Sequence, residues 1–388
     1  MSAQEKKYTA PQQRKVWVLA PYLQTGDANV DYYYDFSQSI QEYTKTFREL
    51  NMEWVWQPVT MQNYRDVIDM IEMDEQASLI LNLCDGDEIN GTPGISVLRY
   101  LHQKKMIYTG ASERFYDVTT SKIIMKRAFD EAGIATPAWR EIPENDPRLD
   151  RIFDDLGKPI IVKPAVSGGS MGVGIKSVVS DIPSLQQQLK VLFDGYRGWS
   201  LTAGGVIAEE YINGPEFTTF IVGDADKRNK AIIYPPVERV FHPALPDNER
   251  FLSFDRLWET YDEETPLPNN EPFYTYHRPQ EELVKSITQL SWDAYVAVAG
   301  KGYGRIDLRM DKNSGRLVVL EVNAQCGISE DEDYTSIGAI LRLSNTGFSQ
   351  MVAAILENAI ARTRIRKPAV AGAKSQTIKK TKRLVKQG

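Results

Sequence analysis

Short apolar runs alternate with amphipathic stretches along the first part of the chain. The apolar runs predict buried strands at 16–20, 53–57, 79–83 and 106–110. The stretches between them predict helices at 34–50, 62–73 and 95–104. This alternation is typical of a parallel sheet with helices on both faces.

The pattern changes after a predicted helix at 119–132, which stops at Gly133, a residue that commonly ends helices. From Ile160 onward, apolar strands follow one another through short loops, and helices are predicted only at 184–193, 279–299 and 348–362. Residues 243–278 are rich in Pro, Asp and Glu and predict a long loop. The sequence therefore predicts an α/β domain followed by α+β structure with antiparallel sheets.

Polar side chains interrupt two of the apolar strands. In "GRIDLRM" (304–310), Arg305, Asp307 and Arg309 share one face, and in "LEVNAQCG" (320–327) Glu321 and Asn323 do the same. The turn "DKNSG" predicts a hairpin with a three-residue loop, which pairs Asp307 with Glu321 and Arg305 with Asn323.

Carboxylates on two directly opposed residues repel each other, so one is protonated unless a cation lies between them. Asp, Glu and Asn oxygens suit Mg²⁺, and Arg305 beside the metal would face an anionic substrate group. The alternative is an ordinary charged hairpin exposed to solvent. The apolar residues on the other face of both strands favour the metal site.

A glycine-rich loop follows another predicted strand, in "KPIIVKPAVSGGSMGVGI" (158–175). Glycines let consecutive amides converge on an anion, while Ser170 adds a hydroxyl and Lys163 a positive charge. The loop lacks the Gly-Lys-Ser/Thr ending of a Walker A motif and the GxGxxG of a dinucleotide fold. We favour phosphate binding over a plain flexible turn.

Composition supports a soluble enzyme without histidine or thiol chemistry. The 388 residues are 42% hydrophobic and 25% charged, and no apolar run is long enough to span a membrane. The two cysteines cannot form a disulfide framework, and no His/Cys group has zinc spacing. The polar N-terminus lacks a signal-peptide core, so we expect a cytoplasmic protein.

Charge is unevenly distributed. The net charge is −6, yet residues 362–388 contain ten Lys or Arg and no acid, so the rest carries about −16. We predict a polar N-terminal segment at 1–14 and a basic, disordered tail at 364–388, and we favour solvation of this tail over contact with nucleic acid.

These stretches, together with "KIIMKRAFDEAGIATPAW", "IAEEYINGPEFT" and "FSQMVAAILENAI", resemble the ATP-grasp ligases, most closely the D-alanine–D-alanine ligase branch. They occur in the family order across roughly residues 79–360. The resemblance implies an N-terminal α/β domain at 15–118, a central ATP-grasp subdomain at 119–212 and a C-terminal one at 213–363. It also implies small-molecule substrates and a homodimer.

The resemblance implies site roles that spacing alone does not give. ATP would be held by the residues of the central subdomain and its edge: Lys122, Lys163, Gly168, Gly169, Ser170, Glu209, Glu210, Tyr211, Ile212 and Glu216. Two Mg²⁺ ions, or Mn²⁺ in their place, would be bound by Asp307, Glu321 and Asn323. Arg305, the Gly327 amide and Ser170 would act on the reacting groups.

The implied reaction joins a carboxylate, that of an amino acid, to an amine. ATP phosphorylates the carboxylate, the amine attacks the acylphosphate and phosphate leaves; catalysis is mainly positioning and charge neutralisation. Two alternatives remain open: a nucleotide-binding regulatory protein without turnover, and a kinase that stops at the acylphosphate.

The chain departs from the family pattern in three places. "APYLQTGDANVDYYYDF" has no match for the Glu that binds the first amino acid's ammonium, which puts D-alanine in doubt. The acceptor loop contains four consecutive acids, Glu330–Asp333, near Thr335 and Ser336. In "FLSFDRLWET", Arg256 stands as a substitute for a lysine near the ATP.

Overall fold

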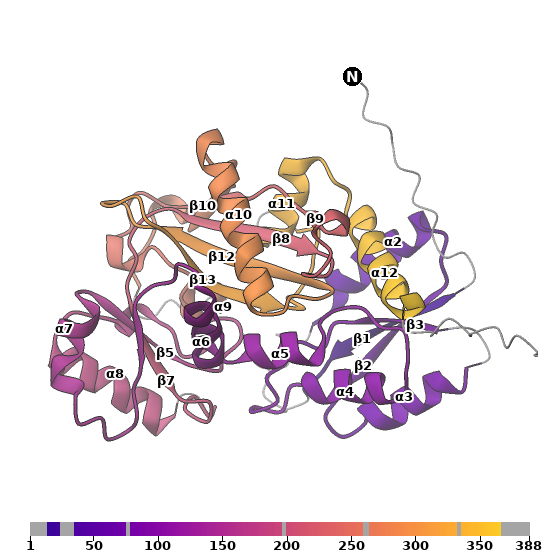
Figure 1. Cartoon of the computed structure of the whole chain (residues 1–388), viewed down its shortest axis with the longest axis horizontal. Helices are drawn as coiled ribbons and strands as arrows, with labels where there is room; N and C mark the ends of the chain where they lie inside the picture. The colour runs from indigo at the N-terminus through magenta and orange to yellow at the C-terminus, as the bar shows by residue number, and fades with distance from the viewer. Residues whose placement is uncertain are drawn as a thin grey trace, which may run out of the picture.

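The computed structural model describes residues 14–23, 35–74, 78–195, 199–258, 264–331 and 335–365 (Figure 1). The N-terminal sheet is parallel, in the order β2-β1-β3. Its strands are β1 (Lys15–Pro21), β2 (Trp54–Val59) and β3 (Ser78–Asn82). The strand predicted at 106–110 is reduced to a single parallel bridge between Tyr108 and Ile80.

Alternate residues of β1 enter two different apolar cores, which explains why this strand is a continuous apolar run. Val16 and Val18 pack with Tyr43 and Phe47 of helix α2 (Ser37–Glu49). Trp17 and Leu19 pack on the other face, in the core that contains α3 (Tyr64–Glu72) and α4 (Ile95–Gln103). The predicted parallel sheet covered on both faces is confirmed.

The central sheet is antiparallel, in the order β4-β7-β5-β6. Its strands are β4 (Trp139–Glu141), β5 (Ile160–Pro164), β6 (Val178–Val179) and β7 (Val206–Glu210). Helix α8 (Ile182–Asp194) packs Leu185, Leu189 and Leu192 against this sheet, beside the short α7 (Ile152–Leu156). Helix α6 (Lys122–Ala132) precedes the sheet and ends at Gly133 in the left-handed conformation, as predicted.

The C-terminal sheet is also antiparallel and runs β11-β10-β8-β12-β13, with β9 paired to β8. Its strands are β8 (Glu216–Val222), β9 (Ile232–Ile233), β10 (Val237–Phe241), β11 (Tyr274–His277), β12 (Tyr303–Met310) and β13 (Leu317–Ala324). Helix α10 (Glu281–Ala297) packs on one face, and α11 (Ser336–Ser344) and α12 (Phe348–Ile365) pack on the other (Figure 1). The predicted fold class is therefore confirmed.

Several local predictions were wrong. Helices α5 (Glu113–Thr120) and α11 were not predicted, and the expected long loop at 243–278 contains α9 (Phe254–Trp258) and strand β11. Helix α12 extends to Ile365, into the segment assigned to the tail. The rest of that tail and residues 1–13 lie outside the described residues. No helix in the described ranges is long and apolar enough to cross a membrane.

The β12–β13 hairpin has the predicted pairing but reaches it differently. Asp307 faces Glu321 and Arg305 faces Asn323, as expected. The turn is one residue longer than the three-residue loop, because Asp311 N donates to Arg316 O. A β-bulge between Asp307 and Leu308 restores the register, with Leu320 as the extra residue.

Candidate active site

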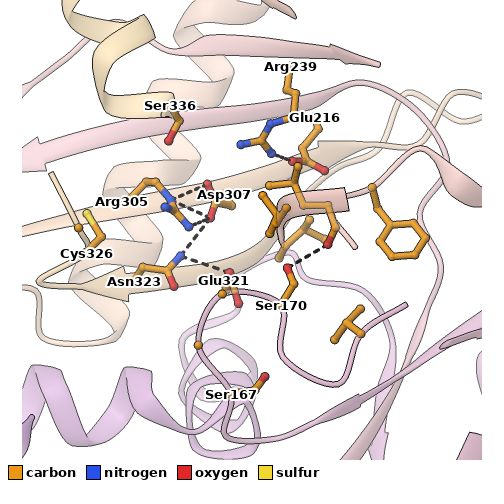
Figure 2. A pocket seen from close by; sticks show the side chains of 18 of the residues that line it. Ser167, Ser170, Glu216, Arg239, Arg305, Asp307, Glu321, Asn323, Cys326 and Ser336 are labelled. Carbon is orange, nitrogen blue, oxygen red and sulfur yellow. Dashed lines mark hydrogen bonds and ion pairs between the residues drawn. The ribbon is translucent and has the colours of Figure 1, made fainter. Parts of the chain in front are cut away.

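A cavity of about 660 Å³ lies where the three sheets meet. The residues to which the resemblance gave site roles all line it: Lys122, Lys163, Gly168, Gly169, Ser170, Glu209, Glu210, Tyr211, Ile212, Glu216, Arg305, Asp307, Glu321, Asn323 and Gly327. Segments up to 200 residues apart in the chain thus form one site, part of which Figure 2 shows.

The metal-ligand candidates lie together on the β12–β13 hairpin. The Asn323 amide lies between the two carboxylates, with Nδ2 3.0 Å from Asp307 Oδ2 and 3.3 Å from Glu321 Oε1 (Figure 2). Rotation of this amide would present its oxygen instead, giving three oxygen donors of the kind that Mg²⁺ prefers. The described residues contain no cluster of three or more His, Cys, Asp or Glu suited to a metal.

The two opposed carboxylates differ in their ionisation. Burial would raise the pKa of Glu321, but the charges of Lys122, Arg305 and Lys163 lower it to about 2. For Asp307, burial and the Glu321 charge raise the pKa, although Arg305 opposes this. A lowered pKa at one carboxylate and a raised pKa at the other is expected of two close carboxylates without a metal between them.

Arg305 holds Asp307 in place from the same strand face. Its Nε lies 3.1 and 3.0 Å from the two Asp307 oxygens, and Nη2 lies 2.9 Å from Oδ2. Thr218 of β8 donates to Asp307 Oδ1 at 2.9 Å. Asp307 is therefore preorganised, and Arg305 keeps part of its guanidinium exposed to the cavity.

Lysines from two elements face the acids of the cavity. Lys122 Nζ lies 3.4 Å from Glu321 Oε2, and Lys163 Nζ lies 2.7 Å from Glu209 Oε2. Sequence reasoning missed a third lysine, the fully buried Lys126, whose Nζ lies 3.4 Å from Glu209 Oε1. Lys126 follows Lys122 by four residues, which places both on one face of α6 and was the available signal.

Glu216 forms ion pairs with two buried arginines. Arg239 of β10 binds its Oε1, and Arg309 Nη2 lies 3.3 Å from its Oε2. Arg239 also donates to Tyr276 Oη at 2.8 Å, and Arg309 donates to Ile212 O at 2.9 Å. Arg239 was not predicted; it lies on an alternating strand, where a buried arginine has no local signature.

The glycine loop faces the hairpin across the cavity, as Figure 2 shows for Ser170. Gly169 and Ser170 both have positive φ, 54° and 60°, and Ser170 Oγ donates to Leu252 O at 2.9 Å. A Cβ added at Gly168 would meet no atom within 4 Å, so its backbone borders open space. Left-handed backbone at a non-glycine residue costs about 1–3 kcal/mol and is common at ligand sites.

The residues at which the chain departs from the family pattern do not all lie in the site. Arg256 is buried and paired with Glu249 and Glu264, so it is not available as a phosphate-binding cation. Glu330 is bound by Lys45, and Asp331 accepts from Gln38; Glu332 and Asp333 lie outside the described residues. Thr335 and Ser336 do line the cavity.

The chain is similar in sequence to proteins of one known family. The family described as "D-ala D-ala ligase C-terminus" matches residues 128–357. The D-alanine--D-alanine ligase of Marinomonas sp. (strain MWYL1) is 26% identical over 253 residues, 65% of this chain and 69% of that protein. The same-named protein of Xanthomonas axonopodis pv. citri (strain 306) is 26% identical over 290 residues, 74% of this chain and 79% of that protein.

Solved structures share the fold. The D-alanine--D-alanine ligase of Bacillus anthracis, complexed with ATP, has a TM-score of 0.65 at 18% identity, covering 92% of this chain and 99% of that one. The VanG D-Ala:D-Ser ligase of Enterococcus faecalis has a TM-score of 0.61 at 17% identity, covering 91% of this chain and 100% of that one.

The fold and the cavity define an ATP-grasp enzyme, an ATP-dependent ligase. Within that class, the chain belongs to the D-Ala–D-Ala ligase C-terminal family, because the match covers more than half of its length. The predicted family is thereby confirmed.

Proposed function

We propose that this protein is a Mg²⁺- and ATP-dependent ligase that joins the carboxylate of an amino acid to an amine through an acylphosphate. One observation carries this proposal: Asp307, Glu321 and Asn323 on the hairpin lie across one cavity from Lys122, Lys163 and the glycine loop. An oxygen-rich metal site opposite phosphate-binding groups is the arrangement that phosphoryl transfer requires.

For the nucleotide, we propose that Lys122 and Lys163 bind phosphate oxygens and that Gly168, Gly169 and Ser170 cover them. Glu209 and Glu210, with the backbone of Tyr211 and Ile212, would hold the base, and Glu216 would hold the ribose. Lys122 and Lys163 are paired with Glu321 and Glu209 in this structure. On nucleotide binding, the phosphates would pair with the two lysines, and the metal would neutralise Glu321. Glu216 is held rigid by Arg239 and Arg309.

For the metal, we propose two Mg²⁺ ions, with Mn²⁺ as a substitute, bound by the hairpin oxygens. A divalent cation would neutralise the Asp307 and Glu321 carboxylates and the transferred phosphoryl group. Arg305 would stabilise negative charge on the reacting acyl group, and the backbone at Gly327 faces the same space, since a Cβ there would meet no atom within 4 Å.

The names of the relatives state D-alanine, and VanG states D-Ala and D-Ser, as their substrates. We propose an amino acid for this chain without choosing D-alanine, because the ammonium-binding Glu has no sequence match and residues 24–34 lie outside the described ranges. The domain limits at 118 and 212 fall between the three sheets and remain our proposal, as do the homodimer and the absence of nucleic-acid binding.

The test is ADP release from Mg-ATP in the presence of a panel of L- and D-amino acids, with products identified by mass spectrometry. Asp307→Asn is expected to lower the rate by roughly 100-fold or more, because charge stabilisation is lost. Asp311→Asn, in the turn of the same hairpin, is the matched control and keeps the rate. If no amino acid stimulates ADP release with any amine, the proposed function is wrong and the non-catalytic alternative is favoured.

A further inference from the structure

The carboxylates that line the cavity differ in one respect. Five of them form ion pairs among the described residues: Glu209 with Lys163, Glu210 with Arg316, Glu216 with Arg239, Asp307 with Arg305, and Glu321 with Lys122. The sixth, Asp85, lines the same cavity with an exposed side chain and has no ion pair or side-chain hydrogen bond within those residues. It is thus the carboxylate of the cavity that is free to receive a substrate group.

Asp85 has no side-chain partner among the described residues, yet its backbone is firmly held. It follows β3, at the carboxyl end of a parallel strand, which is where ligands bind in such sheets. Gln325 donates to the Cys84 carbonyl at 2.8 Å, and Tyr116 Oη donates to the Gly86 carbonyl at 2.7 Å. Both neighbours of Asp85 are therefore anchored, and the side chain is presented from a fixed position.

The charged group that acts on Asp85 is the guanidinium of an arginine. Arg305 of β12 interacts with Asp85 electrostatically. Burial raises the pKa of the nearby thiols of Cys84 and Cys326 and of the phenols of Tyr116 and Tyr303, so all four are neutral at pH 7. The protein around the cavity raises the pKa of Asp85 above its ordinary value of 3.8, although Arg305 opposes this shift.

Amide formation needs a proton acceptor. An aliphatic amine is an ammonium ion at pH 7 and has no lone pair for attack until it loses a proton. No histidine lines the cavity within the described part of the chain, and the two lysines there are paired with glutamates. A base that titrates near the working pH is best suited to the transfer.

We propose that Asp85 is the general base that deprotonates the amine substrate beside Arg305, an inference that rests on the proposed function. The ammonium gives one proton to the Asp85 carboxylate, and the nitrogen lone pair forms the C–N bond at the acylphosphate carbonyl carbon. The C–O bond to phosphate then breaks with its electron pair. A second proton moves from nitrogen to the departing phosphate, and Asp85 later releases its proton to water.

The test compares two nucleophiles in the wild type and Asp85→Asn, with Mg-ATP and a pool of amino acids. Hydroxylamine needs no base, because much of it is neutral at pH 7, and it traps the acylphosphate as a hydroxamate. We expect Asp85→Asn to lower amide formation roughly 100-fold or more and to leave hydroxamate formation within a few-fold of wild type. Asp87→Asn, in the same loop but outside the cavity lining, is the matched control and keeps both rates.

The pH profile gives a second readout. In the wild type, amide formation falls as the pH drops through the raised pKa of Asp85, and Asp85→Asn loses this limb. The hydroxamate comparison is made at pH 7 and above, because hydroxylamine is itself protonated at lower pH. Equal loss of both products in Asp85→Asn would overturn the proposal, since it would place Asp85 at the carboxylate substrate or in the fold. Full amide formation in Asp85→Asn would overturn it as well. Failure of the wild type to make either product refutes the proposed function itself, and the base role with it.

Discussion

Lys126 and Glu209 form an ion pair that solvent does not reach: their side chains are 0% and 2% exposed, and Nζ lies 3.4 Å from Oε1. Glu209 also binds Lys163, which is one of the proposed phosphate ligands. A nucleotide that draws Lys163 away therefore leaves Lys126 as the buried counter-charge of Glu209. Lys126 is in this view a positioning residue of the nucleotide site.

Lys126→Met removes one of the two counter-charges of Glu209. It is expected to destabilise the protein by less than the roughly 3–5 kcal/mol that a fully unpaired buried charge costs, because Lys163 stays paired with Glu209. ATP affinity should also fall, because Lys163 must then neutralise Glu209. Urea unfolding and ATP titration measure the two effects. The double variant Lys126→Met/Glu209→Gln should regain most of the stability, and a double variant as unstable as the single one would contradict this account.

Leu320 is the extra residue of the β13 bulge, and the bulge lets both Leu320 and Glu321 line the cavity. Consecutive residues of a regular strand point to opposite faces, so one of them would otherwise be directed into the core. Leu320→Ala is expected to weaken ATP binding by roughly tenfold, through lost apolar contact. Thermal unfolding should change little, because Leu320 is not part of the apolar cores; an unchanged Kd would show that the bulge serves no nucleotide contact.

Period-2 patterning was enough to place Arg305, Asp307 and Arg309 on the cavity face, because side-chain alternation is a local property of the backbone. The bulge and the longer turn could not be predicted from the sequence, since each depends on how the two strands meet. The predicted pairing was still correct, because the bulge offsets the register shift that the longer turn introduces. Arg239 and Asp85 were missed for a similar reason: each enters the site through tertiary contacts, and neither has a motif of its own. Helix α11 was missed because a loop of acids precedes it and its N-cap, Thr335, was assigned to the loop.

Gly302 precedes strand β12 and Gly315 lies in the turn between β12 and β13, and both have positive φ, 85° and 71°. A Cβ at Gly302 would lie 2.0 Å from the Gly110 carbonyl oxygen, whereas one at Gly315 would meet nothing within 4 Å. Gly315→Ala is expected to cost about 1–2 kcal/mol, from backbone conformation alone. Gly302→Ala should lower the stability clearly more, because the added Cβ would push β12 away from Gly110 in the N-terminal domain. Equal urea midpoints for the two variants would argue against the close contact between Gly302 and Gly110.

Glu42 of α2 is 5% exposed and contacts Ser329, which lines the cavity. Its Oε1 accepts from Ser329 Oγ at 2.6 Å and Gln38 Nε2 at 3.1 Å, while Oε2 has no hydrogen-bond partner among the described residues. Burial raises its pKa above the ordinary 4.5, although the hydrogen bonds from Ser329 and Gln38 oppose the shift. The folded state therefore holds a proton on Glu42 more tightly than the unfolded chain does.

A raised pKa makes the ionised carboxylate a cost to stability above the folded-state pKa, and this cost disappears below pH 4.5, where both states are protonated. Glu42→Gln keeps the acceptor oxygen and removes the charge, so we expect it to stabilise the protein at pH 7 by about 1 kcal/mol. The gain should vanish as the pH falls below 4.5. Urea unfolding of both proteins between pH 4 and 8 measures it, with Glu49→Gln on the same helix as the control. A Glu42→Gln protein that is less stable than wild type at pH 7 would contradict this account. It would mean that the Glu42 carboxylate has a counter-charge in the folded protein.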